Sequence, residues 1–349
     1  MTGSSPPNVS VLLPCHNGSV WLVDAVRSVL TQTFSDIELL IYDDGSTDAS
    51  WPLIERLAAS DRRVIPIRGT PNRGIVHALT TMLNRARGRF IARMDADDIC
   101  LPMRFEQQLA FLDQQKIDLC GSWFQEFGGG LPRRVRWPHR SEELEAAMLF
   151  QNTICHPTIM ARREVFEAVA YRDANILAED YDLFVRAGQQ FRLANVPQVL
   201  LRYRRHPQQA TQAKRSLMEQ VTKRIRLQAL EARGIFASAE EQRIHNIIRA
   251  PESITSLQEM DDIEGWLLKL AAQFDDAQAR AVVASQWTRA AVRAAPLGHA
   301  MLRRYAQSPL RGMMPHRWAE GIDLALLATV RLDYQSPAFN WLRRLGLSG

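Results

Sequence analysis

Three carboxylates stand within four positions of this sequence, in Asp95-Ala96-Asp97-Asp98, directly after the mostly apolar run 90–94. Like charges this close repel one another unless a cation neutralises them. In an open α/β sheet, ligands bind at the carboxyl ends of the strands, where a strand ending at residue 94 would place the cluster. The pattern therefore indicates a cation site, although a solvated acidic turn would have the same composition.

A second acidic pair, Glu179-Asp180, follows about eighty residues later at the start of a predicted helix. A carboxylate in a reaction site can act as a general base towards a hydroxyl group. A helix N-terminus also stabilises carboxylates electrostatically, which would explain the pair without any chemistry. The pair alone leaves both interpretations open.

Strands and helices alternate in the first hundred residues, as in a parallel sheet covered on both faces. We expect strands and helices at the following positions: strands at 9–13, 37–42, 64–67 and 90–94, and helices that begin near 22, 47 and 75. Further on we expect a helix at 102–112 and a helix near 179, with strands at 117–124, 154–160 and 191–203. The pattern from 211 onward is helical. We therefore predict an α/β domain at 1–210 and a helical extension at 211–349.

The composition is that of a soluble globular protein, with 46% hydrophobic and 23% charged residues among 349. The 4 cysteines form no Cys-x-x-Cys pair, which favours a reducing cytoplasm. Residues 1–8 lack the apolar core of a signal peptide. No run approaches the ~20 apolar residues that span a bilayer, so a cytoplasmic protein is expected.

Positive charge gathers at the C-terminus. Residues 277–349 contain ten arginines and only three acidic residues, whereas the net charge of the whole chain is +5. Apolar residues lie beside Arg343 and Arg344 in the last part of this segment: Phe339, Trp341, Leu342, Leu345 and Leu347. This mixture suits peripheral contact with the anionic cytoplasmic face of a membrane, although packing onto the protein would use the same residues. No nucleic-acid-binding module is recognised, so no nucleic-acid partner is expected.

Eight segments, taken together and in order, resemble the inverting glycosyltransferases of family 2, which have the Rossmann-like GT-A fold. They are residues 9–17, 28–34, 43–48, 71–75, 92–98, 155–157, 178–182 and 203–206. The resemblance covers roughly residues 8–207. It implies metal-dependent transfer of a sugar, with inversion, from a nucleotide-diphosphate donor such as a UDP-sugar. The acceptor would be a hydroxyl of a glycan or of a lipid-linked acceptor in cell-surface polysaccharide biosynthesis.

The resemblance also assigns a metal site for Mn²⁺ or Mg²⁺. Asp97 would be the direct ligand, and His206 in Tyr-Arg-Arg-His an additional one. Asp95 would face the ribose or the metal. Asp98 would either join the site or cap the following helix.

The remaining roles implied by the resemblance concern the nucleotide, the base and the acceptor. Asp44 would accept a hydrogen bond from the nucleobase. The other nucleotide-sugar contacts would be Pro14, His16, Asn17, Asn72, Gly74, Asp95 and Ala96. Asp180 matches the catalytic base, and Glu179 would orient the donor sugar. His156 would line the acceptor or donor pocket, or else would only shape a strand entry with Pro157.

Two other functions fit the sequence less well than a glycosyltransferase does. A nucleotidyltransferase would carry a glycine- and arginine-rich loop after the first strand, where this chain has Pro14-Cys15-His16-Asn17-Gly18. A non-catalytic docking protein that uses the basic tail would not need Asp44, Asp95, Asp97 and Asp180 together. The sequence therefore favours the glycosyltransferase, while the donor sugar and the acceptor are left open.

Overall fold

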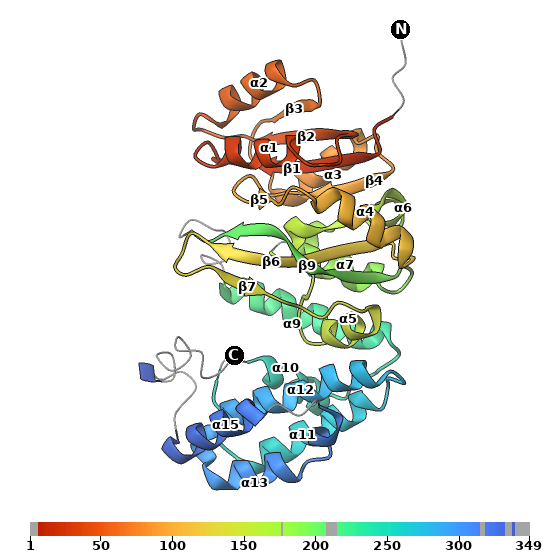
Figure 1. Cartoon of the computed structure of the whole chain (residues 1–349). Coiled ribbons are helices and arrows are strands. Elements are labelled where there is room, and N and C mark those ends of the chain that lie inside the picture. The colour runs from red at the N-terminus through yellow and green to blue at the C-terminus, as the bar shows by residue number, and fades with distance from the viewer. Residues whose placement is uncertain are drawn as a thin grey trace. The chain divides into compact units, whose positions relative to one another are not determined.

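The computed structural model describes residues 6–175, 177–206, 215–250, 252–314, 318–331 and 337–338. The chain divides into two compact units (Figure 1). The first unit comprises Met1–Ser141 and Asn152–Ile225, and the second comprises Glu142–Gln151 and Arg226–Gly349. The predicted boundary at residues 210 and 211 lies outside the described residues, so the division into 1–210 and 211–349 stays a prediction.

The first unit is built on one mixed, mostly parallel sheet. Its strands are β1 (Val9–Cys15), β2 (Ile37–Asp44), β3 (Val64–Gly69), β4 (Phe90–Arg93), β5 (Ile99–Cys100), β6 (Leu119–Phe127), β7 (Arg133–Val135), β8 (Met160–Arg162) and β9 (Leu193–Arg204). In the described residues the strand order is β3-β2-β1-β4-β8-β6-β9-β5, with β7 paired to β6. The first four strands in this order are parallel, β8 is antiparallel to both its neighbours, and β9 is parallel to β6. The predicted α/β architecture is therefore confirmed.

Helices flank this sheet because its central strands are apolar on both faces. They are α1 (Leu22–Leu30), α2 (Ser50–Ser60), α3 (Ile75–Arg85), α4 (Arg104–Gln114), α6 (Arg163–Ala168) and α7 (Glu179–Ala187). All eight residues of β2 are buried. Helix α1 shows the complementary pattern, with Leu22, Val26 and Val29 buried at helical spacing.

The register of the parallel strands brings their carboxyl ends together. Val9 of β1 pairs with Ile37 of β2 and with Phe90 of β4. Because these three strands start in line and run in one direction, the segments that follow them emerge at one edge of the sheet. The acidic end of β2, Asp43-Asp44, and the aspartates after β4 therefore share that edge.

The strand predicted at 154–160 is wrong over most of its length. The structure has a short 3₁₀ helix at His156–Thr158, and β8 begins at Met160. Pro157 has no amide hydrogen to give to a strand ladder. Thr158 instead bonds back to the carbonyl of Cys155 through its amide and its hydroxyl, which closes a turn.

The C-terminal region is helical, as predicted. Its helices are α9 (Arg215–Ala232), which runs from the first unit into the second, and α10 (Ala239–Arg249), α11 (Leu257–Ala271), α12 (Ala277–Arg293), α13 (His299–Gln307), α14 (Leu310–Met313) and α15 (Trp318–Val330). Helix α5 (Ser141–Met148) lies earlier in the chain, almost wholly within the second unit. Trp266, Leu267 and Leu270 are buried along one face of α11, with Phe274 just beyond it.

None of the described helices is both long enough and apolar enough to cross a membrane. The apolar residues predicted for a membrane surface, from Phe339 to Leu347, lie outside the described part of the chain.

Candidate active site

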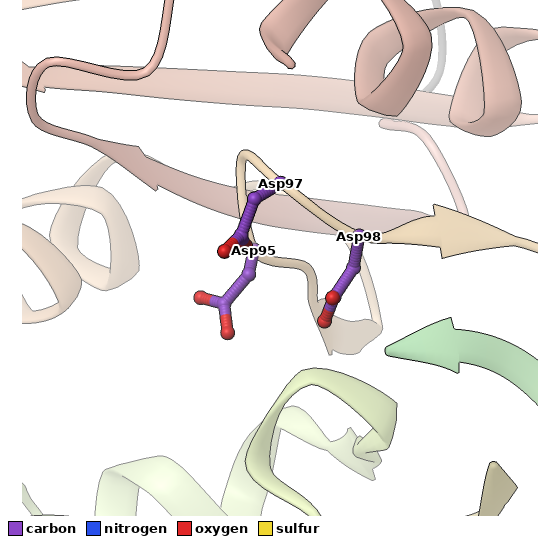
Figure 2. Close-up of side chains that lie close together, drawn as sticks. All are labelled: Asp95, Asp97 and Asp98. Carbon is purple, nitrogen blue, oxygen red and sulfur yellow. The ribbon is translucent and has the colours of Figure 1, made fainter. Parts of the chain in front are cut away.

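The three aspartates after β4 form a compact acidic cluster. One oxygen of each side chain, on Asp95, Asp97 and Asp98, lies within 4.8 Å of the others. Figure 2 shows all three on the loop that joins β4 to β5. Asp98 is buried, while Asp95 and Asp97 are partly exposed. The predicted cluster thus exists as a group of carboxylates at the carboxyl edge of the sheet.

Asp95 is bound by an arginine from its own strand. Arg93 donates from Nη1 to Oδ2 at 2.8 Å and lies 2.5 Å from Oδ1 through Nη2, a bidentate ion pair. Arg93 itself is buried. Burial raises the pKa of Asp95 to about 6, although Arg93 opposes this shift. Both oxygens of Asp95 are therefore already paired with a cation.

Asp97 meets the histidine predicted as a further metal ligand. Nε2 of His206 lies 2.9 Å from Oδ2 of Asp97, although the two residues are 109 positions apart in the chain. Arg204 supports the same loop, since its Nε donates to the carbonyl of Asp97 at 2.8 Å. The end of β9 and the residues after it therefore hold the acidic loop in place.

Asp98 is anchored on one side only. Its Oδ1 accepts from the backbone amide of Arg204 at 2.8 Å. Its Oδ2 is buried and has no hydrogen-bond partner in the described part of the chain. Burial, together with Asp95 and Asp97, raises the pKa of Asp98 well above its ordinary value. The alternative role as a helix cap does not apply, because α4 begins at Arg104 and no side chain caps it.

These residues fit a hard divalent cation. A buried carboxylate oxygen without a partner is costly, and a bound cation would remove that cost. Nδ1 of His206 is also buried without a hydrogen-bond partner among the described residues. Carboxylate oxygens with one imidazole suit Mg²⁺ or Mn²⁺ better than the soft metals that prefer thiolates.

The residues predicted to bind the nucleotide gather around the end of β2. Both oxygens of Asp44 accept backbone amides from the loop before α3, from Arg73 at 2.9 Å and from Gly74 at 2.7 Å. Nδ1 of His16 lies 2.9 Å from the carbonyl oxygen of Asp44. Oδ1 of Asn17 accepts the amide of Thr47 at 2.8 Å. Three loops are therefore joined at the carboxyl edge of the sheet.

The other predicted nucleotide contacts lie on these loops or beside them. Pro14 is partly buried within β1, and Asn72 is exposed before α3. Gly74 has a φ of 86°, a backbone conformation that favours glycine, and no atom lies within 4 Å of the place where its Cβ would be. Ala96 borders the loop after β1, since a Cβ on Gly18 would lie 3.4 Å from the Cβ of Ala96.

The predicted base lies at the first turn of α7 and is held by neutral groups. Oδ2 of Asp180 accepts from Nδ2 of Asn152 at 2.8 Å, and Oδ1 accepts from the amide of Tyr181 at 2.7 Å. Oδ1 of Asn152 in turn accepts the amide of Ile154 at 3.0 Å. This second bond fixes the orientation of the Asn152 side chain, so that its amino group faces Asp180.

The proton affinity of both carboxylates in the pair Glu179-Asp180 is raised. Burial, and next the charge of Glu179, raises the pKa of Asp180 to about 7. Burial also raises the pKa of Glu179, whose Oε2 accepts the amide of Leu177 at 3.0 Å. A carboxylate that titrates near neutral pH is suited to accept a proton from a hydroxyl group.

His156 lies in the interior. Its Nε2 is 2.7 Å from the hydroxyl of Tyr171, and its ring packs edge-on against Phe184. Burial, and next the charge of Arg93, lowers the pKa of His156 well below its ordinary value, so the ring is neutral. Its role in a substrate pocket stays a prediction.

Several of these contacts come from residues that the sequence did not single out. Asn152 is one polar residue among many, and only the fold places it beside Asp180. Arg93 did carry a signal, since it is a charge inside a buried strand directly before three aspartates. Arg104, which the sequence did not single out either, is fully buried in α4. It donates to the carbonyl of Arg93 at 2.8 Å and so fixes the end of β4.

The sequence is similar to those of known glycosyltransferases. The sequence profile of Glycosyl transferase family 2 matches residues 10–170. The putative glycosyltransferase EpsE of Bacillus subtilis is 32% identical over 213 residues, which cover 58% of this chain and 74% of EpsE. The O-antigen biosynthesis glycosyltransferase WbnJ of Escherichia coli is 27% identical over 206 residues, 57% of this chain and 80% of WbnJ.

A solved structure shares the fold. Residues 1–349 of S. aureus TarS, crystallised with UDP-GlcNAc, superpose with a TM-score of 0.56, covering 91% of this chain and 90% of that one. The sequence identity is 15%, so this likeness concerns the fold alone. It confirms the predicted GT-A architecture.

Proposed function

The chain belongs to glycosyl transferase family 2 and is a glycosyltransferase, and on that premise we propose that it is an inverting, metal-dependent enzyme of cell-surface polysaccharide biosynthesis. The donor is a UDP-sugar, and the acceptor is a hydroxyl of a glycan or of a lipid-linked sugar. The observation that carries the proposal is the presence, in one folded unit, of an acidic cluster with a partnerless buried oxygen and of a carboxylate with raised proton affinity. The UDP-GlcNAc bound to TarS and the O-antigen role named for WbnJ support the donor class and the process.

In this proposal Asp97 and His206 hold a Mn²⁺ or Mg²⁺ ion, with the free oxygen of Asp98 beside them. When bound, the ion would stabilise negative charge on the departing diphosphate as a Lewis acid. Asp95 already shares two contacts with Arg93, so it suits the ribose better than the ion. Arg204 keeps the loop in the geometry that this site requires.

The uridine half of the donor lies on the joined loops at the carboxyl edge of the sheet. Asp44 fixes the loop before α3, and its neighbours Asn72 and Gly74 offer backbone to the nucleobase. Pro14, His16 and Asn17 line the other side, next to Ala96. The open space over Gly74 supports a close approach of the nucleotide there.

Asp180 acts as the base in a single displacement. It takes the proton of the acceptor hydroxyl as the oxygen attacks the anomeric carbon from the face opposite the diphosphate. Asn152 and the amide of Tyr181 hold the carboxylate at a fixed angle and stabilise its ionised form. Glu179, at the same helix end, orients the donor sugar.

We place this reaction at the cytoplasmic face of the cell membrane, where the arginine-rich C-terminal segment makes peripheral contact with anionic lipid. The arginines of 277–349 support that contact electrostatically. Co-sedimentation of the full chain with vesicles containing anionic lipid tests it. A chain that stays in the supernatant at low salt would contradict the contact without touching the transfer chemistry.

A donor screen tests the proposed activity. Nucleotide sugars are supplied with Mn²⁺ and with a membrane extract as acceptor source, and released nucleoside diphosphate is measured. We expect release from UDP-sugars that stops when EDTA removes the metal. The same release with and without EDTA would contradict the metal dependence, and an α-linked product from an α-linked donor would contradict inversion.

A further inference from the structure

Four arginines gather on one face of the β7–β6–β9 part of the sheet. Arg134 of β7 and Arg202 of β9 both pair with Gln125 of β6, and Arg204 pairs with Phe127. Alternate residues of a strand share a face, so these three arginines lie on one side, and Arg136 follows Arg134 on the same side. We call Arg134, Arg136, Arg202 and Arg204 the arginine face.

The opposite side of the same strands belongs to the core. Phe124 is buried there, and Val135 and Tyr203 pack against the main hydrophobic cluster. The two faces therefore differ in kind, with an apolar face directed inward and a cationic one directed outward. Ordinary amphipathic patterning would also put polar residues outside, but it does not require that they all carry one sign of charge.

Aromatic rings hold several of these guanidinium groups in place. Arg202 lies 4.3 Å from the ring centre of Phe127, and Arg204 lies 4.5 Å from the same ring. Arg136 lies over Trp123 at 5.5 Å. A stacked guanidinium is restrained by its ring, and its N–H groups point along its edge towards a ligand. This order distinguishes the face from freely moving surface arginines.

The charge of three of these arginines is not balanced by carboxylates among the described residues. In the described part of the chain, no acidic side chain forms an ion pair with Arg134, Arg136 or Arg202. The acidic residue of these strands, Glu126, alternates to the other face and pairs with Arg133 and Arg205. The uncompensated positive charge fits an anionic ligand.

The arginine face adjoins the acidic loop. Arg204 stacks on Phe127 with its guanidinium and donates from the same group to the carbonyl of Asp97. A ligand that touched both the face and the reaction site would therefore have its anionic group close to the sugar being transferred. The acceptor is the substrate that enters the site in addition to the donor.

We propose that the arginine face binds the diphosphate of an acceptor in which a sugar is carried on a diphosphate group. This inference rests on the proposed function and narrows its acceptor class. Guanidinium forks bind phosphate oxygens in pairs, and the forks of Arg134 and Arg202, on either side of Gln125, match the several oxygens of a diphosphate. A flat membrane surface needs charge but not ring-restrained geometry. The aromatic rings of this face are already stacked with guanidinium groups, Phe127 with Arg202 and Arg204, and Trp21 with Arg204 as well.

Calorimetry with inorganic diphosphate as the probe tests the site. EDTA is present, so that no metal ion can bind the probe at the acidic loop. Arg134→Ala with Arg202→Ala should weaken binding about 100-fold or more, because two charge-assisted hydrogen-bonding groups are removed and each contributes about tenfold or more. Arg204 is left unchanged, since it also supports the loop of Asp97. Circular dichroism checks that each variant is folded.

The matched control removes two exposed arginines from another part of the same unit, Arg56 and Arg62, with the same change in net charge. We expect Arg56→Ala with Arg62→Ala to bind diphosphate like the wild type. A further variant, Arg134→Lys with Arg202→Lys, keeps the charge and loses the fork, and we expect an intermediate loss. An equal loss in the control, or none in the alanine variant, would overturn the proposal.

Two more outcomes distinguish this proposal from a membrane contact and from a failure of the proposed function. If the alanine variant lost binding to anionic vesicles and kept its affinity for diphosphate, the face would be a membrane contact and the proposal would be wrong. Binding of UDP in Mn²⁺ by the wild type is measured separately. Its absence, with diphosphate still bound at the face, would break the proposed function and leave the anion site standing.

Discussion

The two acidic sites of the first unit are held by opposite kinds of partner. In the loop after β4, the carboxylates of Asp95 and Asp97 meet an arginine and a histidine. At the start of α7, Asp180 receives hydrogen bonds from a side-chain amide and a backbone amide, both neutral. Asp95, Asp97 and Asp180 are all partly exposed, so the difference lies in the partners rather than in exposure.

This difference separates two chemical tasks. A cationic partner such as Arg93 opposes the effect of burial on the pKa of Asp95 and so favours the ionised carboxylate, the form that suits a site beside a metal ion. Neutral donors in a dry setting let the proton affinity rise, which a general base needs. In the proposed function, the aspartate cluster after β4 and the Glu179-Asp180 pair therefore take different roles, cation site and proton acceptor, because of their surroundings.

The largest expected effect is the loss of the cation site. Asp97→Ala should weaken the Mn²⁺-dependent binding of UDP by at least about 100-fold, because changes even to residues around a metal's own ligands cost about 10–100-fold. Calorimetry with UDP and Mn²⁺ measures this. Asp113→Ala, an exposed aspartate of α4, is the matched control. Unchanged affinity in the Asp97 variant would remove that residue from the metal site.

Replacing the base should affect turnover and leave donor binding in place. Asp180→Asn keeps the shape of the side chain and removes its proton affinity, so kcat should fall about 10²–10⁴-fold. Binding of UDP in Mn²⁺ should stay within about twofold of the wild type. Asp173→Asn, an exposed neighbour, should behave as the wild type. Near-normal turnover in the Asp180 variant would point to Glu179 as the base.

A smaller effect is expected where Asn152 holds the base. Asn152→Ala removes a donor that stabilises the ionised carboxylate, so kcat should fall about tenfold. The pKa of Asp180, about 7 in the intact site, should rise, and the acid limb of the kcat profile should move to higher pH. Asn84→Ala on α3 is the exposed control. A loss of activity with an unmoved acid limb would show a role for Asn152 other than positioning the base.

The smallest expected effect is on stability. The folded protein raises the pKa of Asp180 from 3.8 to about 7, so it binds that proton more tightly than the unfolded chain. The resulting stabilisation is present below pH 4 and is lost as the pH rises through 7. In Asp180→Asn the replaced side chain does not titrate. The melting temperature of this variant should therefore rise relative to that of the wild type between pH 5 and pH 8. Melting curves in EDTA with the same pH dependence for both proteins would contradict the raised pKa.

The sheet could be predicted because each central strand is recognisable from its own short stretch of sequence. β1 and β2 are apolar runs interrupted only by Ser10 and Glu38, and they end at Cys15 and at the acidic Asp43-Asp44, so both the run and its end are visible in one short segment. The 3₁₀ turn at His156–Thr158 was missed for the opposite reason. An apolar segment around a proline has the composition of a strand, and only its bonds to Cys155 reveal the turn.

The candidate site was predictable in its residue types and not in its contacts. Acidic and histidine residues are visible in the sequence, but the pairing of Asp97 with His206 spans 109 positions. The partners that distinguish the two acidic sites, Arg93 and Asn152, are set by burial and by chain folding. The arginine face likewise depends on the register of three strands, which no single segment contains.

Asp44 ties down the loop before α3 with both of its carboxylate oxygens. Fixing the backbone of one residue costs about 1–2 kcal/mol of conformational entropy, and here that loss accompanies folding. In the proposed function, a nucleotide that binds beside Gly74 meets a loop that is already ordered, so less of its binding enthalpy is offset by ordering the chain. Donor binding at this edge should therefore show a small entropic penalty, whatever sugar the nucleotide carries.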